Sequence, residues 1–221
     1  MRVVIAGGHG QIGLRLSRQL EIRGDRPVGL IRNPDHADDV RDAGAEPVLC
    51  DLEAAGVAEV AAAIEGADAA VFAAGAGGGS GAARKDTMDY GGSVLLADAA
   101  ERAGVRRFVQ ISSAGAGRPP DPSRGDVWAA YIDAKTRAEE DLRARPALDW
   151  TVIRPGHLTN VQGTGLLTLS TSPIPPGDIA RDDVAAAVIA FLAEPRTIGL
   201  TIEAVNGPEP LPEAIRLLVD G

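Results

Sequence analysis

A glycine-rich turn joins an apolar segment to a helical segment at the start of the chain. The apolar residues 3–6 are followed by glycines at positions 7, 10 and 13, spaced as G-x-x-G-x-x-G, and a helical pattern begins at once. Such a turn directs backbone N–H groups and the positive end of a helix dipole toward one point, where a diphosphate binds favourably. Gly7 permits the turn, Gly10 lets a phosphate approach, and Gly13 lets the helix pack closely on the strand. The alternative is a β–α turn that binds no ligand.

Strand-like and helix-like segments alternate along the rest of the chain. After residues 3–6, strands are expected at residues 26–31, 46–50, 67–73, 105–111, 150–154 and 200–205. Helices are expected at residues 11–23, 56–65, 87–103, 127–145, 181–193 and 212–219, with a short one from Asn33 to about Gly44. This alternation predicts an α/β fold, a Rossmann-type doubly wound parallel sheet of order 3-2-1-4-5-6. The segment at 200–205 offers a seventh strand.

The length of 221 residues fits a single domain over residues 1–221. Three stretches are expected to be irregular, at residues 75–84, 115–126 and 155–178. Each follows a strand, so each is expected on the rim formed by the carboxyl ends of the sheet, where long loops usually carry function. Residues 155–180 are therefore expected to form a short C-terminal elaboration on the substrate side of the same domain.

Charge and cysteine content exclude several classes of partner. The net charge of −9 argues against nucleic acid and anionic membranes as partners. The single cysteine, Cys50, cannot form an internal disulfide, which fits a reducing cytoplasm. No apolar run is long enough to span a bilayer, and the N-terminus lacks the pattern of a secretory signal. We expect a cytoplasmic protein with a small-molecule substrate and no metal site, and leave open whether it forms a homodimer.

The end of the second strand indicates which dinucleotide the chain would bind. A ribose with a free 2′-hydroxyl is usually held there by an acidic side chain. Here Arg32 takes that place, and a guanidinium can hold a 2′-phosphate with two hydrogen bonds. The sequence therefore favours NADP(H) over NAD(H). The alternative is an exposed arginine at a strand end, and the nearby Asp35, Asp38 and Asp39 weaken the phosphate interpretation.

Two more strand ends carry candidate cofactor contacts. Asp51-Leu52 follows the third strand, and the Asp51 carboxylate either accepts a hydrogen bond from an adenine amino group or caps the next helix. Ala73-Ala74-Gly75 ends the fourth strand with small residues, which would let the backbone approach a ribose. A plain glycine turn is the alternative there.

Tyr131 and Lys135 stand four residues apart in a helical segment, in a chain with only two tyrosines and two lysines. Ser112 and Ser113 follow the fifth strand, and a serine at that carboxyl end faces the same crevice. These residue types suit carbonyl reduction: a phenol supplies the proton, an adjacent ammonium stabilises the phenolate, and a serine hydroxyl holds the substrate oxygen. The alternative is an exposed pair, because the neighbouring Arg137, Glu139 and Glu140 give this helix a solvated face.

Seven motifs together resemble the short-chain dehydrogenase/reductase family in its atypical or extended branch. They are Gly7-Gly8-His9-Gly10-Gln11-Ile12-Gly13, Asp51-Leu52, Ala73-Ala74-Gly75, Ile111-Ser112-Ser113-Ala114, Tyr131-Ile132-Asp133-Ala134-Lys135, Ile153-Arg154-Pro155-Gly156 and Asp183-Val184-Ala185. The resemblance covers nearly the whole chain. It is greatest to the compact bacterial members described as NAD(P)-binding, epimerase-like or NmrA-like.

The resemblance implies roles for individual residues. Ser113 would orient the substrate, Tyr131 would be the acid/base, and Lys135 would also bind the nicotinamide ribose. Pro155 and Gly156 would border the nicotinamide, and Gln11 and Ile12 in the glycine turn would contact the cofactor. Two departures stand out: residues 90–92 read Tyr-Gly-Gly where relatives often have an asparagine, and the segment after Pro155 is too short for a nucleotide-sugar subdomain.

The first functional hypothesis is an NADP(H)-dependent oxidoreductase that transfers hydride between nicotinamide and a small carbonyl or hydroxyl substrate by a Tyr-Lys-Ser mechanism. The second is an NADP(H)-sensing regulatory protein of the NmrA-like kind, which would not need Tyr131 and Lys135. The third is a flavin or tetrapyrrole reductase. His157 either touches the substrate or only packs within its loop.

Overall fold

Strands and helices alternate along residues 1–220, which the computed structural model describes. The strands are β1 (Arg2–Ala6), β2 (Arg26–Ile31), β3 (Glu46–Leu49), β4 (Ala69–Phe72), β5 (Arg107–Ile111), β6 (Asp149–Pro155), β7 (His157–Thr159), β8 (Leu166–Ser170), β9 (Asp178–Ala180), β10 (Thr201–Asn206) and β11 (Glu209–Pro210). The α-helices are α1 (Gln11–Ile22), α2 (Ala37–Asp42), α3 (Val57–Ala63), α4 (Ala82–Arg84), α5 (Ser93–Ala103), α6 (Asp126–Arg143), α7 (Arg181–Ala193) and α8 (Leu211–Asp220). A π-helical segment, η2 (Lys85–Gly92), joins α4 to α5, and short 3-10 turns occur at η1 (Pro34–His36), η3 (Pro122–Arg124) and η4 (Pro195–Thr197).

The strands confirm the predicted Rossmann-type sheet. Nine strands of the described chain form one sheet in the order β11-β8-β10-β6-β5-β4-β1-β2-β3. The six strands from β6 to β3 reproduce the expected order 3-2-1-4-5-6 and are all parallel. β10 adds the seventh strand, parallel to β6. β8 and β11 extend that edge in antiparallel pairing, and β7 and β9 form a separate parallel pair.

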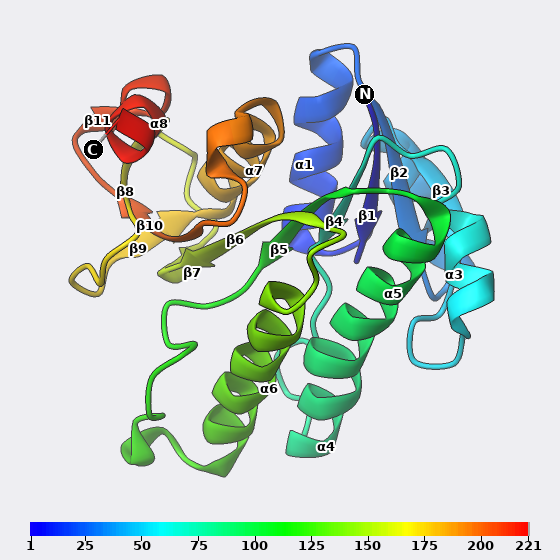
Figure 1. The fold of residues 1–221 in the computed structure, drawn as a ribbon, viewed down its shortest axis with the longest axis horizontal. Helices are drawn as coiled ribbons and strands as arrows, with labels where there is room; N and C mark the ends of the chain where they lie inside the picture. The colour runs from blue at the N-terminus through cyan, green and yellow to red at the C-terminus, as the bar shows by residue number, and fades with distance from the viewer. Residues whose placement is uncertain (221) are drawn as a thin grey trace.

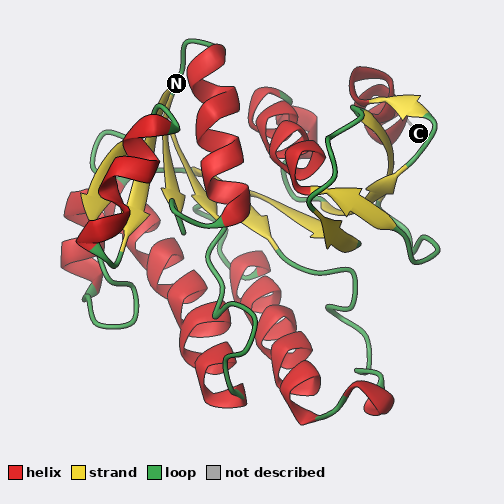
Figure 2. Ribbon diagram, turned by 180° about the vertical axis from the view of Figure 1, so that it is seen from behind, coloured by secondary structure: helices red, strands yellow, loops and turns green. Residues whose placement is uncertain are grey.

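Helices cover both faces of the sheet, as Figures 1 and 2 show from opposite sides. α1, α7 and α8 lie on one face, and α3, α5 and α6 lie on the other. β1 illustrates the sequence requirement: Val3 and Ile5 pack into the first core cluster, while Val4 and Ala6 pack into the second. Because successive side chains of a strand point to opposite faces, a strand buried on both sides must be apolar throughout.

The predicted helix ends agree with the structure where a capping residue or a glycine marks them. Asn33 Oδ1 accepts a hydrogen bond from the Asp35 backbone N–H at 3.1 Å, and Pro34 opens the turn η1. Gly104 ends α5 in the left-handed region, with φ of 72°. Local capping chemistry is therefore enough to place these ends.

Two expectations on the carboxyl-end rim were wrong. The helix predicted from residue 87 begins at Ala82 with the short α4, and the π-helical segment η2 follows, with Gly91 and Gly92 lowering the α-helical propensity at its end. Residues 155–178, expected to be irregular, contain β7 and β8 and the start of β9. β8 forms because Leu167 is fully buried against the α7 and α8 core and its backbone pairs with β10, more than 30 residues later.

No helix in residues 1–220 has the length and apolar character needed to cross a membrane.

Candidate functional site

A cavity of about 1120 Å³ opens at the carboxyl ends of β4, β5 and β6 and is closed on one side by α6. Several predicted site residues meet in its wall. They are Ile12, Ala73, Ala74, Gly75, Ser113, Tyr131, Lys135 and Pro155. Parallel strands bring their carboxyl ends to one edge, so residues far apart in sequence converge there. His157 also lies in the wall, where its Nδ1 is 3.0 Å from an Asp178 carboxylate oxygen.

The remaining predicted cofactor residues lie outside the wall that the described residues form. They are Gly7, Gly10, Gln11, Gly13, Arg32, Asp51 and Leu52. They follow β1, β2 and β3, the strands on the other side of the switch point between β1 and β4. The predicted site is therefore split into a half beside Tyr131 and a half along the β1–β3 edge.

The glycine turn has the geometry expected of a phosphate cradle. A Cβ atom on Gly13 would lie 2.3 Å from the Gly7 carbonyl oxygen, and one on Gly7 would lie 2.8 Å from the Ala74 backbone, so neither position tolerates a side chain. Gly7 has φ of 82°. The N-terminus of α1 carries no acidic residue in its first turn, and Gly10, its N-cap, offers no side-chain hydrogen bond. First-turn N–H groups left without a side-chain cap fit a dinucleotide diphosphate.

Arg32 is not free at the end of β2. Its Nη1 lies 3.1 Å from Glu53 Oε2, and the same carboxylate also accepts hydrogen bonds from Arg84 and Thr87. The hydrogen bond from Arg84 is the main reason that the pKa of Glu53 is below its usual range. The Arg32 side chain remains half exposed. A phosphate placed there would compete with Glu53 for the guanidinium.

The contacts of Asp51 bear on its two predicted roles, an adenine contact and a helix cap. Its Oδ1 accepts a hydrogen bond from the Glu53 backbone N–H at 3.0 Å and so closes a tight turn. It does not cap the next helix, because α3 begins after Gly56 without a side-chain cap. Of the two alternatives, helix capping is therefore excluded, because the carboxylate instead closes the local Asx turn, while the adenine contact stays a prediction.

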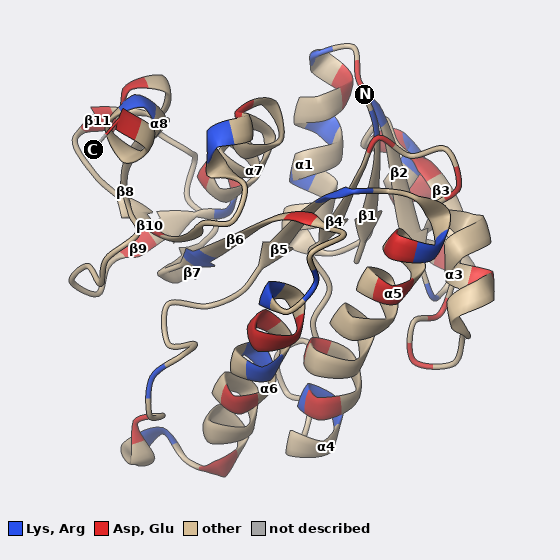
Figure 3. Ribbon diagram, in the orientation of Figure 1, with Lys and Arg blue, Asp and Glu red and all other residues tan. Residues whose placement is uncertain are grey.

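Tyr131 and Lys135 lie on the same side of α6, and both line the cavity. The Lys135 ammonium is buried: its Nζ is 3.2 Å from Asp89 Oδ1, 3.3 Å from the Ile111 carbonyl oxygen and 5.8 Å from the centre of the Tyr131 ring. Tyr131 itself is half-buried and tilted against Trp128, with 5.4 Å between ring centres. Tyr131 and Lys135 therefore face the cavity. Elsewhere on α6, charged residues of alternating sign follow one another along the helix (Figure 3).

The two serines after β5 have different environments. Ser112 is 4% exposed, and its hydroxyl donates to Glu139 Oε1 at 2.5 Å, so it is engaged in the protein interior. Ser113 is half-buried in the cavity wall. The backbone N–H of Ala114 donates to the Pro155 carbonyl and so joins the loop that carries Ser113 to the end of β6. Both serines line the cavity, and Ser113 is the more exposed of the two.

Sequence reasoning missed three residues of the site. Asp89 is 1% exposed and pairs with Lys135, and its Oδ2 accepts a hydrogen bond from the Ala76 backbone N–H at 3.1 Å. Lys85 is 9% exposed and lies in the cavity wall. Glu139 is fully buried beneath Ser112. One signal was available for Asp89 and Lys85: both occur within a glycine-containing segment that directly follows a predicted rim loop.

One carboxylate joins two loops above the cavity. Glu203 on β10 accepts hydrogen bonds from the Ile174 backbone N–H, at 3.0 Å, and from Arg118. Ile174 belongs to the segment between β8 and β9, while Arg118 belongs to the loop after β5. Residues 155–180 are therefore held against the main sheet beside the cavity.

A family model described as NAD(P)H-binding matches residues 7–195 of this chain. A Bacillus subtilis protein named as an uncharacterized sugar epimerase, YhfK, is 35% identical over 219 residues, covering 99% of this chain and all of the relative. A Saccharomyces cerevisiae protein, YMR090W, is 34% identical over 232 residues and covers 99% of both chains.

Solved structures show the same relationship. A Bacillus halodurans protein, described provisionally as an NAD-dependent epimerase/dehydratase, superposes with a TM-score of 0.89 at 33% identity, covering 99% of this chain and all of the other. The Lactococcus lactis oxidoreductase ylbE superposes with a TM-score of 0.84 at 26% identity, covering 100% and 98%. The chain belongs to the NAD(P)H-binding family, within the atypical short-chain dehydrogenase/reductase and NmrA-like group.

Proposed function

We propose that this protein is an NADP(H)-dependent oxidoreductase that transfers hydride between nicotinamide and a small carbonyl or hydroxyl substrate. The observation that carries the proposal is the convergence of Ser113, Tyr131 and Lys135 on one cavity that also reaches Ile12 and the turn after β4. A regulatory NADP(H) sensor has no use for a phenol and a buried ammonium at that position. The chain acts as one domain, with residues 155–180 on the substrate side.

The protein residues have separate roles in this proposal. The reduced nicotinamide, when bound, supplies the hydride. The Tyr131 hydroxyl donates the proton that the substrate oxygen requires, and the Ser113 hydroxyl holds that oxygen in place. Lys135 would bind the nicotinamide ribose, and its positive charge would stabilise the negative charge that develops on the Tyr131 oxygen as the proton is transferred. Asp89 holds the Lys135 ammonium through their ion pair, so Asp89 is a positioning residue.

Arg32 carries the proposed preference for NADP(H). Replacing Arg32 with alanine is expected to raise the Kd for NADPH about tenfold and to change the Kd for NADH less than about twofold, because only NADPH has the 2′-phosphate. This rise in the Kd for NADPH is small for the loss of a charged hydrogen bond, because Glu53 already holds the Arg32 guanidinium. Isothermal titration calorimetry with both cofactors measures the two changes.

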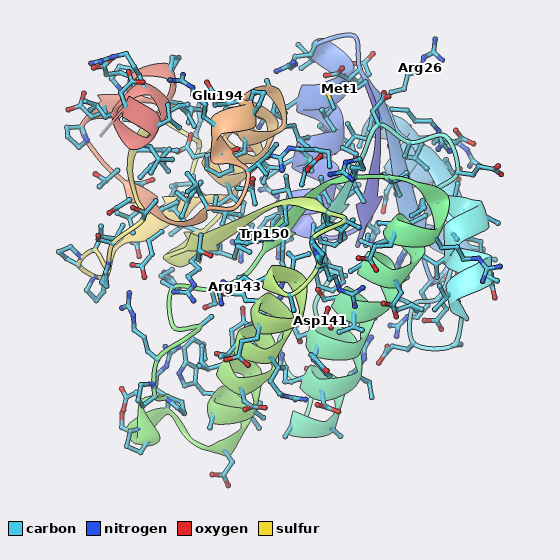
Figure 4. All side chains as sticks on the ribbon, viewed as in Figure 1. Met1, Arg26, Asp141, Arg143, Trp150 and Glu194 are labelled. Atoms are coloured by element: carbon cyan, nitrogen blue, oxygen red, sulfur yellow. The ribbon has the colours of Figure 1, made fainter. Side chains whose placement is uncertain are left out.

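The matched control for that variant is Arg26→Ala. Arg26 begins the same strand at its opposite end and is exposed, projecting away from the fold in Figure 4. It should leave both affinities unchanged. Equal losses of NADPH and NADH binding in Arg32→Ala would refute the phosphate role of Arg32.

A direct assay tests the proposed function. Thermal unfolding is first followed during titration with NADPH and NADH, which shows binding without turnover. Aldehydes, ketones and quinones are then added with the preferred cofactor, and the loss of reduced-cofactor absorbance is recorded. We expect stabilisation by NADPH and turnover of at least one small carbonyl. Cofactor binding with no turnover of any compound in this panel would contradict the oxidoreductase and favour the sensor.

A further inference from the structure

The cavity is cationic in an acidic protein. The chain has a net charge of −9. Among the described residues, the cavity wall contains six Lys or Arg side chains but only three Asp or Glu side chains. The cations are Lys85, Lys135, Arg118, Arg124, Arg154 and Arg181, and the acids are Asp89, Asp178 and Glu203. A cleft whose charge opposes that of the whole molecule attracts ligands of the complementary sign.

Three of the six cations are neutralised by buried or partly buried acids. Lys135 pairs with Asp89. Arg154 binds Glu139 with two hydrogen bonds, at 2.9 and 2.6 Å. Arg118 pairs with Glu203. These cations are already satisfied and are poor candidates for binding a further anion.

The other three cations are held by neutral groups within residues 1–220. The Lys85 Nζ donates to the Gly77 carbonyl oxygen at 2.9 Å. Arg181 donates to the Leu158 carbonyl and to the Asn160 side chain, and burial is the main cause that lowers the pKa of Arg181. The Arg124 guanidinium stacks on Trp128, 3.3 Å from the ring centre. Each of these cations keeps its charge available to a ligand.

Lys85 and Arg124 both lie near Tyr131, the proposed reacting group, Lys85 directly and Arg124 through Trp128. The Lys85 Nζ is 5.4 Å from the centre of the Tyr131 ring. Tyr131 also contacts Trp128, with 5.4 Å between ring centres, and Arg124 stacks on Trp128. A buried ammonium with no acid partner is costly, and an anionic ligand that pairs with Lys85 would offset that cost. An anionic group a few bonds away from a carbonyl that meets Tyr131 would reach Lys85.

We propose that the substrate of this cavity is a carbonyl compound bearing a carboxylate or a phosphate, and that Lys85 binds this anionic group with Arg124 at the outer side. The inference rests on the proposed oxidoreductase function, because Tyr131 fixes where the carbonyl lies. Lys85 is the specificity-determining residue in it. Arg124 strengthens binding through its charge, which is more exposed to solvent than that of Lys85.

Matched pairs of anionic and neutral ligands test the proposal by binding alone. The pairs are 4-oxopentanoate with its methyl ester, and dihydroxyacetone phosphate with dihydroxyacetone. The first pair tests a carboxylate and the second a phosphate. The chain has two tryptophans, and only Trp128 lies in the cavity wall, so the fluorescence of Trp150→Phe reports on the cavity. Calorimetry on the unsubstituted chain gives the same affinities if that variant does not fold.

We expect the anionic member of at least one pair to bind at least about tenfold more tightly than its neutral partner, as expected for a charged hydrogen bond. Lys85→Met should remove this difference, and Lys85→Arg should keep part of it. Arg102→Met, which removes an exposed charge on α5, is the control and should change nothing. The Kd for NADPH should stay within about threefold in Lys85→Met.

The outcomes separate this inference from the proposed function. Anion preference that depends on Lys85, without turnover, would support the inference and contradict the oxidoreductase. Turnover of neutral carbonyls with no anion preference in either pair would overturn the inference and leave the oxidoreductase standing. A large loss of NADPH affinity in Lys85→Met would overturn it too, since Lys85 would then serve the cofactor.

Discussion

Replacing Tyr131 with phenylalanine is expected to lower kcat at least about 1000-fold and to leave the Kd for NADPH within about twofold. The substitution removes one hydroxyl and keeps the ring that contacts Trp128, so the cavity wall should not change. General acid catalysis by a positioned side chain contributes about 100- to 10,000-fold, which sets the size of the effect. Single-turnover kinetics with reduced cofactor measures the chemical step, and calorimetry measures cofactor binding.

Tyr90→Phe is the matched control, since Tyr90 is the other tyrosine of the chain. Its ring lies 4.3 Å from the Arg137 guanidinium, outside the cavity wall formed by the described residues. This variant should keep its full rate. A Tyr131→Phe protein with normal turnover would remove the acid/base role from Tyr131. Loss of NADPH binding in Tyr131→Phe would show instead that the ring holds the cofactor.

The fold and half of the site could be predicted because their signals are local. The apolar runs of β1 to β6 and the left-handed glycine after α5 are read from a few adjacent residues, and the alternation of elements then sets the sheet order. The convergence of Ser113, Tyr131 and Pro155 could be predicted from the sequence alone, because each follows or faces the carboxyl end of a parallel strand. The order and direction of the strands were enough to predict that these residues meet, without knowledge of their contacts.

The ion pairs of the site could not be predicted: the glycine-containing segment 85–92 marks where Asp89 and Lys85 lie, but not what their side chains contact. Asp89 and Lys135 are 46 positions apart, and Asp89 lies in the π-helical segment η2, which the sequence did not predict. Lys85 stands between Arg84 and Asp86 in the sequence, and these charged neighbours give no sign that it is buried. Burial of a charged side chain depends on the elements packed against it, and a single sequence does not give those contacts.

The segment after β6 shows a different limit. Residues 155–178 are rich in Gly, Pro, Ser and Thr, which favours a loop. Leu167 and Leu169 do alternate with polar residues, but such a short run predicts a strand weakly. β8 is stabilised instead by two partners, β10 and β11, that come later in the chain. The Asp183 carboxylate adds hydrogen bonds to the backbone N–H groups of Thr164 and Gly165, at 3.0 and 2.8 Å.

Glu139→Gln is expected to lower the free energy of unfolding by about 3 kcal/mol, the largest effect on stability that we predict. The carboxylate is fully buried and accepts from Ser112 and from two arginines, Arg154 and Arg143. Arg143 lies at the C-terminal end of α6, as labelled in Figure 4. A neutral amide keeps the shape of the side chain but leaves both guanidinium groups without their counter-charge, and its NH2 group faces donors.

Urea unfolding measures this effect, with an expected fall in the midpoint of about 1 to 2 M for a slope of about 2 kcal/mol per M. The neighbouring Glu140→Gln is the control: Glu140 is exposed, so it should change the free energy of unfolding by less than about 0.5 kcal/mol. Equal stability of the two variants would show that water replaces the carboxylate around Arg143 and Arg154. A large loss confined to Glu139→Gln would instead show that the buried carboxylate compensates the charges of Arg143 and Arg154, in the same cluster that holds the Ser112 hydroxyl.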